Sequence, residues 1–147
     1  MLKYISYRSL ILLFIIFLSS CARYQKQWDQ VRIETKEPHS GILGAWTGTW
    51  KSMPTGHNGK LKCIIKEKDD NVYEFYYWAT WAKVLSGGFR TSCEVSKKDA
   101  LWTFEGTQNL GALGGKFSHK GKATSKKIEA TYKAEHGDHG IFTLTRP

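Results

Sequence analysis

Long apolar runs, catalytic motifs and cysteines are all scarce in this chain of 147 residues. The longest apolar run, Leu10 to Leu18, is too short to span a bilayer, because a spanning helix needs about 20 such residues. The sequence contains no Gly-x-Ser-x-Gly, no Walker glycine loop, no His-Glu-x-x-His and no carboxylate pair in an apolar setting. These absences favour a binding protein over an enzyme, and we expect no cofactor.

Acidic residues are also few, with 13 Asp and Glu against 22 Lys and Arg, so the formal net charge is +9. Without residues 1–20, which include Lys3 and Arg8, 20 basic and 13 acidic residues leave a charge of +7. In a cytosolic protein this balance suggests nucleic acid. Outside the cytoplasm it suggests anionic lipids, envelope polymers or an acidic partner, or simply lysines that keep the protein soluble.

The N-terminus has the parts of an export signal. Lys3 and Arg8 precede the apolar run, and two serines and Cys21 follow it. A membrane anchor helix with an incidental cysteine is the alternative interpretation.

The segment Leu18-Ser19-Ser20-Cys21 resembles the lipobox of bacterial lipoproteins, in which the cysteine is lipidated and becomes the first mature residue. The resemblance implies a signal peptide over residues 1–20 and a bilayer anchor through Cys21. It places the protein in the cell envelope, where no nucleic-acid partner is expected. Because Ala22 rather than Asp follows the cysteine, the resemblance favours the outer membrane, with the protein facing the periplasm.

Residues 21–43 are polar and of mixed charge, and no apolar period holds for long. We therefore predict a flexible tether, which as a coil of this length would reach roughly 25 Å. The alternative is a short element formed by Trp28, Val31 and Ile33 and docked on the domain.

Residues 44–147 change to short runs rich in aromatic and β-branched residues, separated by breaks rich in Gly, Asn, Asp and Lys. This spacing predicts one all-β domain, a small eight-stranded antiparallel up-and-down β-barrel, and we expect a monomer. The expected strands are Trp46–Ser52, Lys60–Lys66, Val72–Thr80, Phe89–Ser96, Leu101–Thr107, Lys116–Thr124, Lys127–Ala134 and Gly140–Thr145.

Alternation along these strands assigns one face to the interior and one to solvent. Six lysines fall on outward positions, namely Lys60, Lys62, Lys66, Lys116, Lys120 and Lys122. Tyr76 and Trp78 also face outward and predict an outer aromatic patch. Cys63 and Cys93 face inward on strands two apart, so they are either a candidate disulfide in a flattened barrel or two buried thiols.

The connections between the strands form two sets. The second, fourth and sixth are short and charged, whereas the first, third, fifth and seventh are longer, richer in glycine and partly apolar. Function concentrates in loops of the second kind, so we expect an open barrel end that binds a small apolar or amphipathic ligand. Its predicted mouth and lining are Trp50, Tyr77, Trp81, Val84, Leu85, Leu110, Leu113 and His119.

Gly44-Ala45-Trp46 on the first strand resembles the Gly-x-Trp of lipocalins and related calycin barrels, where the Trp closes the base of the barrel. The whole body resembles small exported barrels of this calycin type, with Trp-x-Gly-x-Trp, Gly-His-x-Gly-x-Leu, Ala-Thr-Trp and Asp-His-Gly blocks. The resemblance implies ligand carriage. It departs from the lipocalin pattern in its short body, its lack of a C-terminal helix and its lack of a Thr-Asp-Tyr motif.

His136, Asp138 and His139 lie in the seventh connection, and His57 lies in the first, which pairing of the first and last strands brings near. Imidazole and carboxylate groups predict a zinc or copper site; solvated turn histidines are the alternative.

The sequence thus predicts a lipid-anchored carrier of a small ligand. The alternative is an envelope interaction or structural protein, inhibitor-like or binding anionic surfaces, whose barrel interior is packed and has no pocket.

Overall fold

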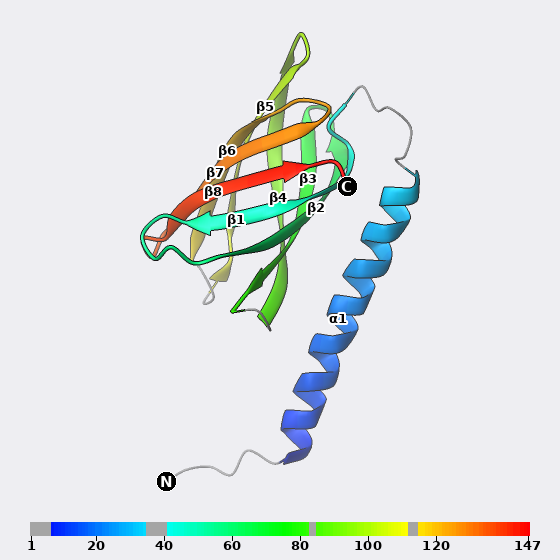
Figure 1. The fold of residues 1–147 in the computed structure, drawn as a ribbon, viewed down its shortest axis with the longest axis vertical. Helices are drawn as coiled ribbons and strands as arrows, with labels where there is room; N and C mark the ends of the chain where they lie inside the picture. Colours follow the sequence, from blue (N-terminus) through cyan, green and yellow to red (C-terminus); the bar gives the residue numbers. More distant parts are fainter. Residues whose placement is uncertain (1–6, 35–40, 83–84, 112–114) are drawn as a thin grey trace.

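The computed structural model describes residues 7–34, 41–82, 85–111 and 115–147. One helix, α1 (Tyr7–Glu34), precedes eight strands and lies outside the barrel that they form (Figure 1). The strands are β1 (Gly44–Ser52), β2 (Asn58–Asp69), β3 (Val72–Trp81), β4 (Leu85–Lys98), β5 (Leu101–Asn109), β6 (Lys116–Ala123), β7 (Lys127–Ala134) and β8 (His139–Thr145). Each corresponds to a strand expected from the sequence.

The sheet closes on itself. Each strand pairs antiparallel with its neighbour in the chain, and β1 pairs with β8 from Thr47 opposite Thr145 to Ser52 opposite Gly140. The predicted all-β, eight-stranded antiparallel up-and-down barrel is therefore confirmed. Closure removes the two long open edges of a flat sheet, which are common sites of aggregation. The pairing of β4 with β5 covers only Cys93–Lys98 of β4, and among the described residues the preceding part of β4 pairs with β3 alone.

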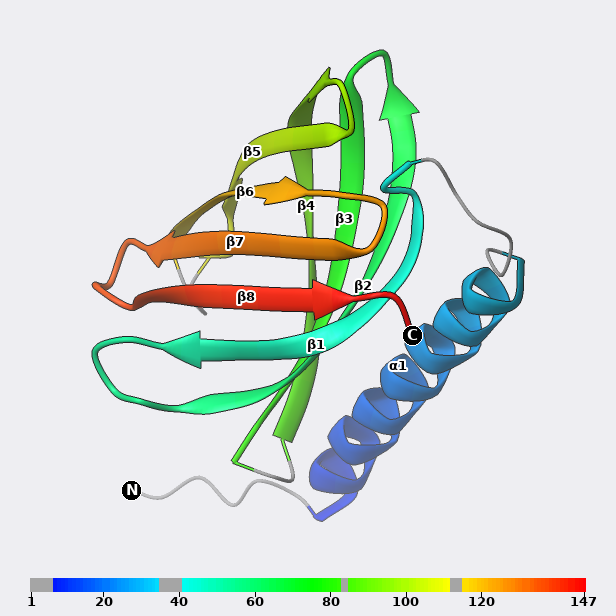
Figure 2. The same ribbon diagram turned by 45° about the horizontal axis from the view of Figure 1, so that its top comes forward.

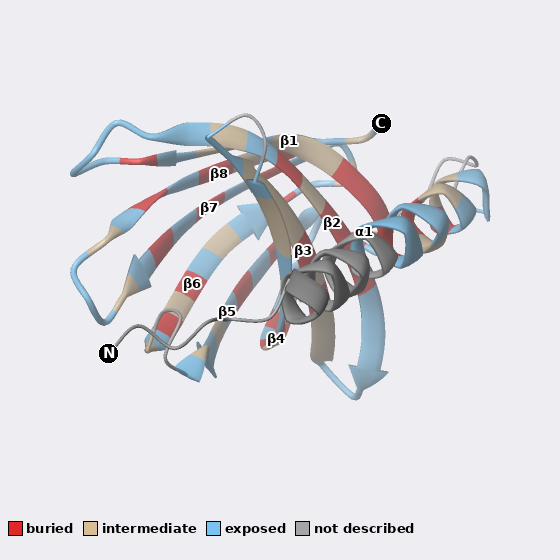
Figure 3. Cartoon of the chain, turned by 90° about the horizontal axis from the view of Figure 1, so that it is seen from below, coloured by how far each residue is buried: buried red, intermediate tan, exposed pale blue. Residues whose placement is uncertain are grey.

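Buried and exposed residues alternate along the strands, as Figure 3 shows. In β7, for example, Ile128, Ala130 and Tyr132 are buried and the residues between them are exposed. Aromatic rings fill much of the interior, with centroids of Phe75 and Phe104 at 4.8 Å and of Tyr132 and Phe142 at 4.9 Å. The alternation predicted from the sequence is confirmed.

The barrel has two unlike ends (Figure 2). The short-turn end carries the connections at residues 70–71, 99–100 and 124–126. The loop end carries the connections that join β1 to β2, β3 to β4, β5 to β6 and β7 to β8. Asn71 and Asp99 adopt positive φ in the short turns, 58° and 55°. Asn and Asp tolerate this left-handed conformation better than most residues, which explains tight turns at these positions.

Trp46 and Arg146 close the short-turn end. Trp46 is fully buried and its Nε1 donates to the Ile42 carbonyl at 2.9 Å. The Arg146 guanidinium lies 3.8 Å from the Trp46 ring centroid, and donates to the carbonyls of Gly41 and Leu43, both at 2.8 Å. Burial lowers the pKa of Arg146 to about 10, so this side chain stays charged at neutral pH.

The segment predicted as a flexible tether is helical over residues 21–34, which corrects that prediction. Tyr24, Trp28 and Val31 are buried against the outside of β1–β3, while Ile33 is 58% exposed. The alternative of a docked element is thus confirmed for Trp28 and Val31 but wrong for Ile33. The spacing i, i+4, i+7 puts Tyr24, Trp28 and Val31 on one helix face, a period that the polar residues between them conceal.

Docking covers the predicted outer aromatic patch. The Tyr24 ring stacks on Trp78 with centroids 5.0 Å apart and meets Tyr76 edge-on at 4.7 Å. Ile64 and Ala45, which also face outward, are buried in the same cluster. The patch is therefore the surface on which α1 docks.

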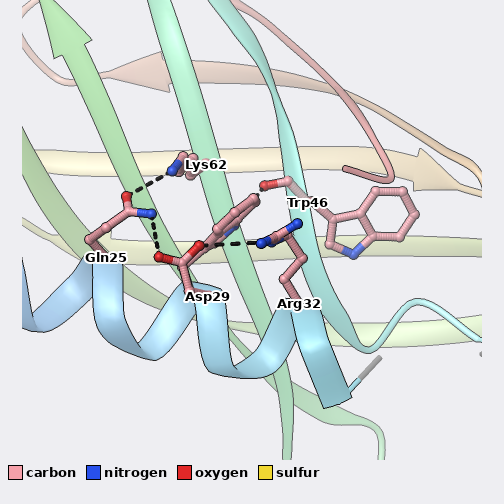
Figure 4. A network of polar contacts seen from close by, with 6 residues as sticks. Gln25, Asp29, Arg32, Trp46 and Lys62 are labelled. Atoms are coloured by element: carbon pink, nitrogen blue, oxygen red, sulfur yellow. Dashed lines mark hydrogen bonds and ion pairs between the residues drawn. The ribbon is translucent and has the colours of Figure 1, made fainter. Parts of the chain in front are cut away.

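Polar contacts between α1 and the barrel surround this apolar docking surface (Figure 4). Trp28 Nε1 donates to the Trp46 carbonyl at 3.1 Å, while Lys62 Nζ donates to Gln25 at 2.8 Å and lies 4.1 Å from the Trp28 ring centroid. Gln25 in turn donates to Asp29 at 2.8 Å. In the described part of the chain, no helix is both long and apolar enough to cross a membrane.

Candidate functional site

The inward faces of β1, β3 and β4 carry apolar side chains up to the loop end. Trp50 is half-buried there, and its Nε1 donates to the Thr80 carbonyl at 2.9 Å. Gly59 permits this arrangement, because a Cβ at that position would lie 2.7 Å from Trp50 Nε1. Trp50 therefore lies across the start of β2 as part of the wall.

Trp81 and Leu85 pair across the β3–β4 hairpin at the rim and are 40% and 54% exposed. The Trp81 ring lies against Gly87, where a Cβ would be 3.0 Å from the ring. Leu110, at the β5–β6 connection, is half-buried and packs against the main core. We call Trp50, Trp81, Leu85 and Leu110 the mouth. Of the other predicted mouth residues, Val84 and Leu113 lie outside the described residues.

Phe89 lies between the mouth and the deeper interior. It is half-buried, stacks on Tyr77 with centroids 5.1 Å apart and meets the Phe117 ring edge-on at 5.1 Å. Although its inward orientation follows from strand alternation, no sequence pattern distinguishes Phe89 from the other inward aromatic residues.

Below Phe89, a few buried polar groups lie among the aromatic rings of the interior. Tyr77, Thr91, Cys93 and His119 are at most 2% exposed and form what we call the inner polar cluster. The Cys93 sulfur lies 3.5 Å from His119 Nε2. The rings of Phe75, Phe104 and Tyr77 surround the imidazole, with centroid distances of 5.7, 5.6 and 5.5 Å. The structure therefore brings the predicted Tyr77 and His119 together, away from the rim.

Gly106 makes the Cys93–His119 contact possible. It sits on β5 between them, opposite Cys93 on one side and His119 on the other. A Cβ at this glycine would lie 2.8 Å from the Cys93 sulfur and 3.2 Å from Thr91 Oγ1. The gap lets side chains of β4 and β6 meet across an intervening strand, which no local sequence pattern reveals.

The inner polar cluster is neutral at pH 7. Burial lowers the pKa of His119 to about 4, against the opposing effect of the Gly106 backbone. Burial likewise raises the pKa of the Cys93 thiol to about 12 and raises the pKa of Tyr77 well above its usual value. A neutral imidazole beside a neutral thiol is not the ion pair that activates a nucleophilic cysteine.

Cys63 and Cys93 are both free and fully buried. Cys63 pairs directly with Tyr77 on β3, and β3 separates it from Cys93 on β4. Of the two alternatives drawn from the sequence, the structure has the buried thiols rather than the disulfide.

The candidate metal residues do not form a metal centre. Among the described residues, no group of three His, Cys, Asp or Glu side chains is placed to hold a metal ion. Asp138 instead accepts hydrogen bonds from Ser52 Oγ at 2.6 Å and from the Tyr132 hydroxyl at 3.0 Å. His57, His136 and His139 are exposed, as the alternative of solvated turn histidines has it.

A hollow lies along the outer wall of β4–β8 and includes Lys120 and Lys122. Its lining holds four acidic residues (Asp70, Glu94, Glu105, Glu129) against three lysines (Lys97, Lys120, Lys122). Of the other lysines predicted to face outward, Lys60, Lys66 and Lys116 are exposed and Lys62 is half-covered by α1. The outer hollow is thus of mixed charge, despite the positive charge of the chain.

Neither a family model nor a curated protein matches this sequence. The structure is similar to a solved one described as a de novo designed fluorescence-activating β-barrel, with a TM-score of 0.52 and 15% identity. The similarity covers 72% of this chain and 94% of the designed chain. At this identity the similarity shows the fold alone: the chain has the fold of a small closed β-barrel.

Proposed function

We propose that the barrel binds a small apolar or amphipathic molecule at its loop end. The observation that carries this proposal is the mouth, where Trp81 and Leu85 are 40% and 54% exposed at the rim. Exposed apolar side chains gathered at one place on a rigid scaffold are typical of a binding site. The similar designed barrel is described as fluorescence-activating, which is in keeping with a small-molecule site in this architecture.

The apolar surface that a ligand buries sets the expected affinity. A ligand that removes about 300 Å² of apolar surface from water gains roughly 7 kcal/mol by transfer. Lost freedom of motion and ordering of the rim reduce this gain. We therefore expect dissociation constants in the micromolar range or weaker.

The test is a titration of the full chain with N-phenyl-1-naphthylamine, an uncharged apolar probe that fluoresces when it leaves water. Leu85→Ser and Trp81→Ala should each weaken binding by about fivefold or more, because each removes roughly 1–2 kcal/mol of apolar contact. Ile141→Ser is the matched control, since Ile141 is 42% exposed on the outer face of β8. Absence of saturable binding, or equal loss in the control, would overturn the proposal.

We also propose that Cys21 is the lipid anchor of an exported protein in the cell envelope, facing the periplasm from the outer membrane. Cys21 is exposed on α1, three residues before the buried Tyr24. An acyl chain on this thiol would therefore attach close to the barrel wall. Cys21→Ala should abolish acylation and membrane fractionation of the chain. If Cys21→Ala fractionates with the membrane as before and is processed normally, the proposed anchor is refuted.

Binding of an anionic envelope component through the outer wall is the second candidate. The observation in favour of this candidate is the outer hollow, which includes Lys120 and Lys122. The four acidic residues of the hollow would weaken its attraction for an anion. Two results together would favour this candidate. The chain should retain envelope fractions less well at high salt and after Lys120→Glu, and the apolar probe should fail to bind at the mouth.

A further inference from the structure

Three buried polar atoms of the inner polar cluster have no hydrogen-bond partner among the described residues: Tyr77 Oη, Thr91 Oγ1 and His119 Nδ1. The nearest polar groups are the Cys63 thiol beside Tyr77, the Cys93 thiol beside Thr91 and the Gly106 backbone beside His119, and none of them meets hydrogen-bond geometry with these three atoms. An unsatisfied buried polar group costs about 1–3 kcal/mol. Because such groups are few in native proteins, three in one cluster indicate a partner that the chain itself does not supply.

Resting on the proposed function, we propose that the ligand is uncharged and places one hydrogen-bonding group, a hydroxyl or a carbonyl, on the inner polar cluster. Its apolar part occupies the mouth. The pathway between the two runs past Phe89, which touches Tyr77 and is itself half-buried. Because the Phe89 ring stacks on Tyr77, a ligand that reaches from the mouth to the cluster must displace this ring.

The surroundings of the cluster select against charge. The imidazole is enclosed by rings of Phe75, Phe104, Phe117 and Tyr77 at centroid distances of 5.5–6.0 Å. No charged group from β3, β4, β5 or β6 is among the buried residues of the described interior. A carboxylate placed there loses its hydration and meets no countercharge, which costs several kcal/mol.

The cluster suits a group that both donates and accepts. The Tyr77 and Thr91 hydroxyls each offer one proton and accept others, and the neutral imidazole has one N–H and one free nitrogen. His119 stays neutral down to about pH 4, the value to which burial lowers its pKa. A phenol, an alcohol or a ketone meets these requirements, whereas a fatty acid anion does not.

The experiment compares three probes of one shape on the full chain at pH 7, by quenching of tryptophan fluorescence: naphthalene, 2-naphthol and 2-naphthoate. We expect 2-naphthol to bind about tenfold more tightly than naphthalene, because one hydrogen bond to a buried, otherwise unpaired group is worth about 1–1.5 kcal/mol. Naphthoate should bind more weakly than naphthalene.

Tyr77→Phe and Thr91→Val each remove a hydroxyl and keep the shape of the side chain. In the double variant, the ratio of the affinity for 2-naphthol to the affinity for naphthalene should fall from about ten to below three. Tyr73→Phe is the matched control, since Tyr73 is half-buried on β3 near the short-turn end. Unfolding midpoints of the two single variants, the double variant and the control report whether each barrel is intact.

The outcomes separate the two proposals. If 2-naphthol keeps its advantage in the double variant, or naphthoate binds as tightly as 2-naphthol, this inference is overturned and the mouth remains a binding site. If none of the three probes binds to the wild-type chain, the proposed function fails together with the inference.

Discussion

Replacing Trp28 by Ala should release α1 from the barrel without unfolding the barrel. Trp28 is 6% exposed, donates to the Trp46 carbonyl and lies under the Lys62 ammonium. The barrel is closed by its own strands and buries its core independently of the helix. Loss of the Trp28 side chain therefore removes stability from the docked helix and leaves the closed sheet in place.

The magnitude follows from what the side chain buries. A tryptophan removes about 200 Å² from water, worth up to about 5 kcal/mol, and the helix alone already covers part of that area. With the hydrogen bond (about 1 kcal/mol) and the cation–π contact (about 0.5–1 kcal/mol), Trp28→Ala should weaken docking by about 3–5 kcal/mol. Trp28→Phe, which keeps a ring but loses the donor, should cost about 1–2 kcal/mol.

Limited trypsin digestion of the full chain in mild detergent measures the docking. Arg23 and Lys26 lie on the docked helix, so Trp28→Ala should speed cleavage after them by at least tenfold while the strand circular dichroism stays unchanged. Ile33→Ala is the control, because Ile33 is 58% exposed and its loss should change docking by less than 0.5 kcal/mol. Equal cleavage rates in wild type and Trp28→Ala would refute the docking energetics, and so would loss of the strand signal.

Three further results are expected in the interior. Because burial lowers the pKa of His119 from 6.5 to about 4, the stability that its neutral form contributes is fully present above pH 6.5. About 3 kcal/mol of it is lost as the pH falls to 4, and denaturant titrations of His119→Phe should lack this component. Gly106→Ala should lower the free energy of unfolding by about 1–3 kcal/mol, since the added Cβ would lie 2.8 Å from the Cys93 sulfur; an unchanged denaturation midpoint would contradict the close packing. In the unlipidated chain, Ellman's reagent should titrate Cys21 rapidly, and Cys63 and Cys93 only after unfolding, because both are buried with raised pKa; rapid reaction of all three thiols would refute the packed interior.

Local patterns were sufficient to predict the barrel. Alternation such as Ile128, Ala130 and Tyr132 against Glu129 and Thr131 fixes the inward face of a strand wherever one side is buried. Eight such strands joined by short connections leave a closed meander as the arrangement without open edges. The strand order and the inward residues are therefore present in the sequence itself.

Local sequence patterns could not predict side-chain contacts between different strands. The Cys93–His119 pair depends on two registers and on the missing side chain of Gly106, and each is set only once the barrel closes. The docked helix was predicted only as an alternative to a tether, with Ile33 in place of Tyr24, for another reason. Tyr24, Trp28 and Val31 form a stripe of three residues, which becomes significant only when a partner surface is known to exist.

The hydrogen bonds from Arg146 to Gly41 and Leu43 have a consequence for the order in which this chain can fold. The guanidinium ties together carbonyls of Gly41 and Leu43, more than 100 residues away in the sequence. Neither this contact nor the β1–β8 pairing exists until nearly the last residue of the chain is available. Contacts of such long range are entropically expensive and slow to form. During synthesis, β1 therefore keeps one unpaired edge until β8 is available, and Arg146 then fixes the segment before β1 to the segment after β8 in addition to the β1–β8 pairing.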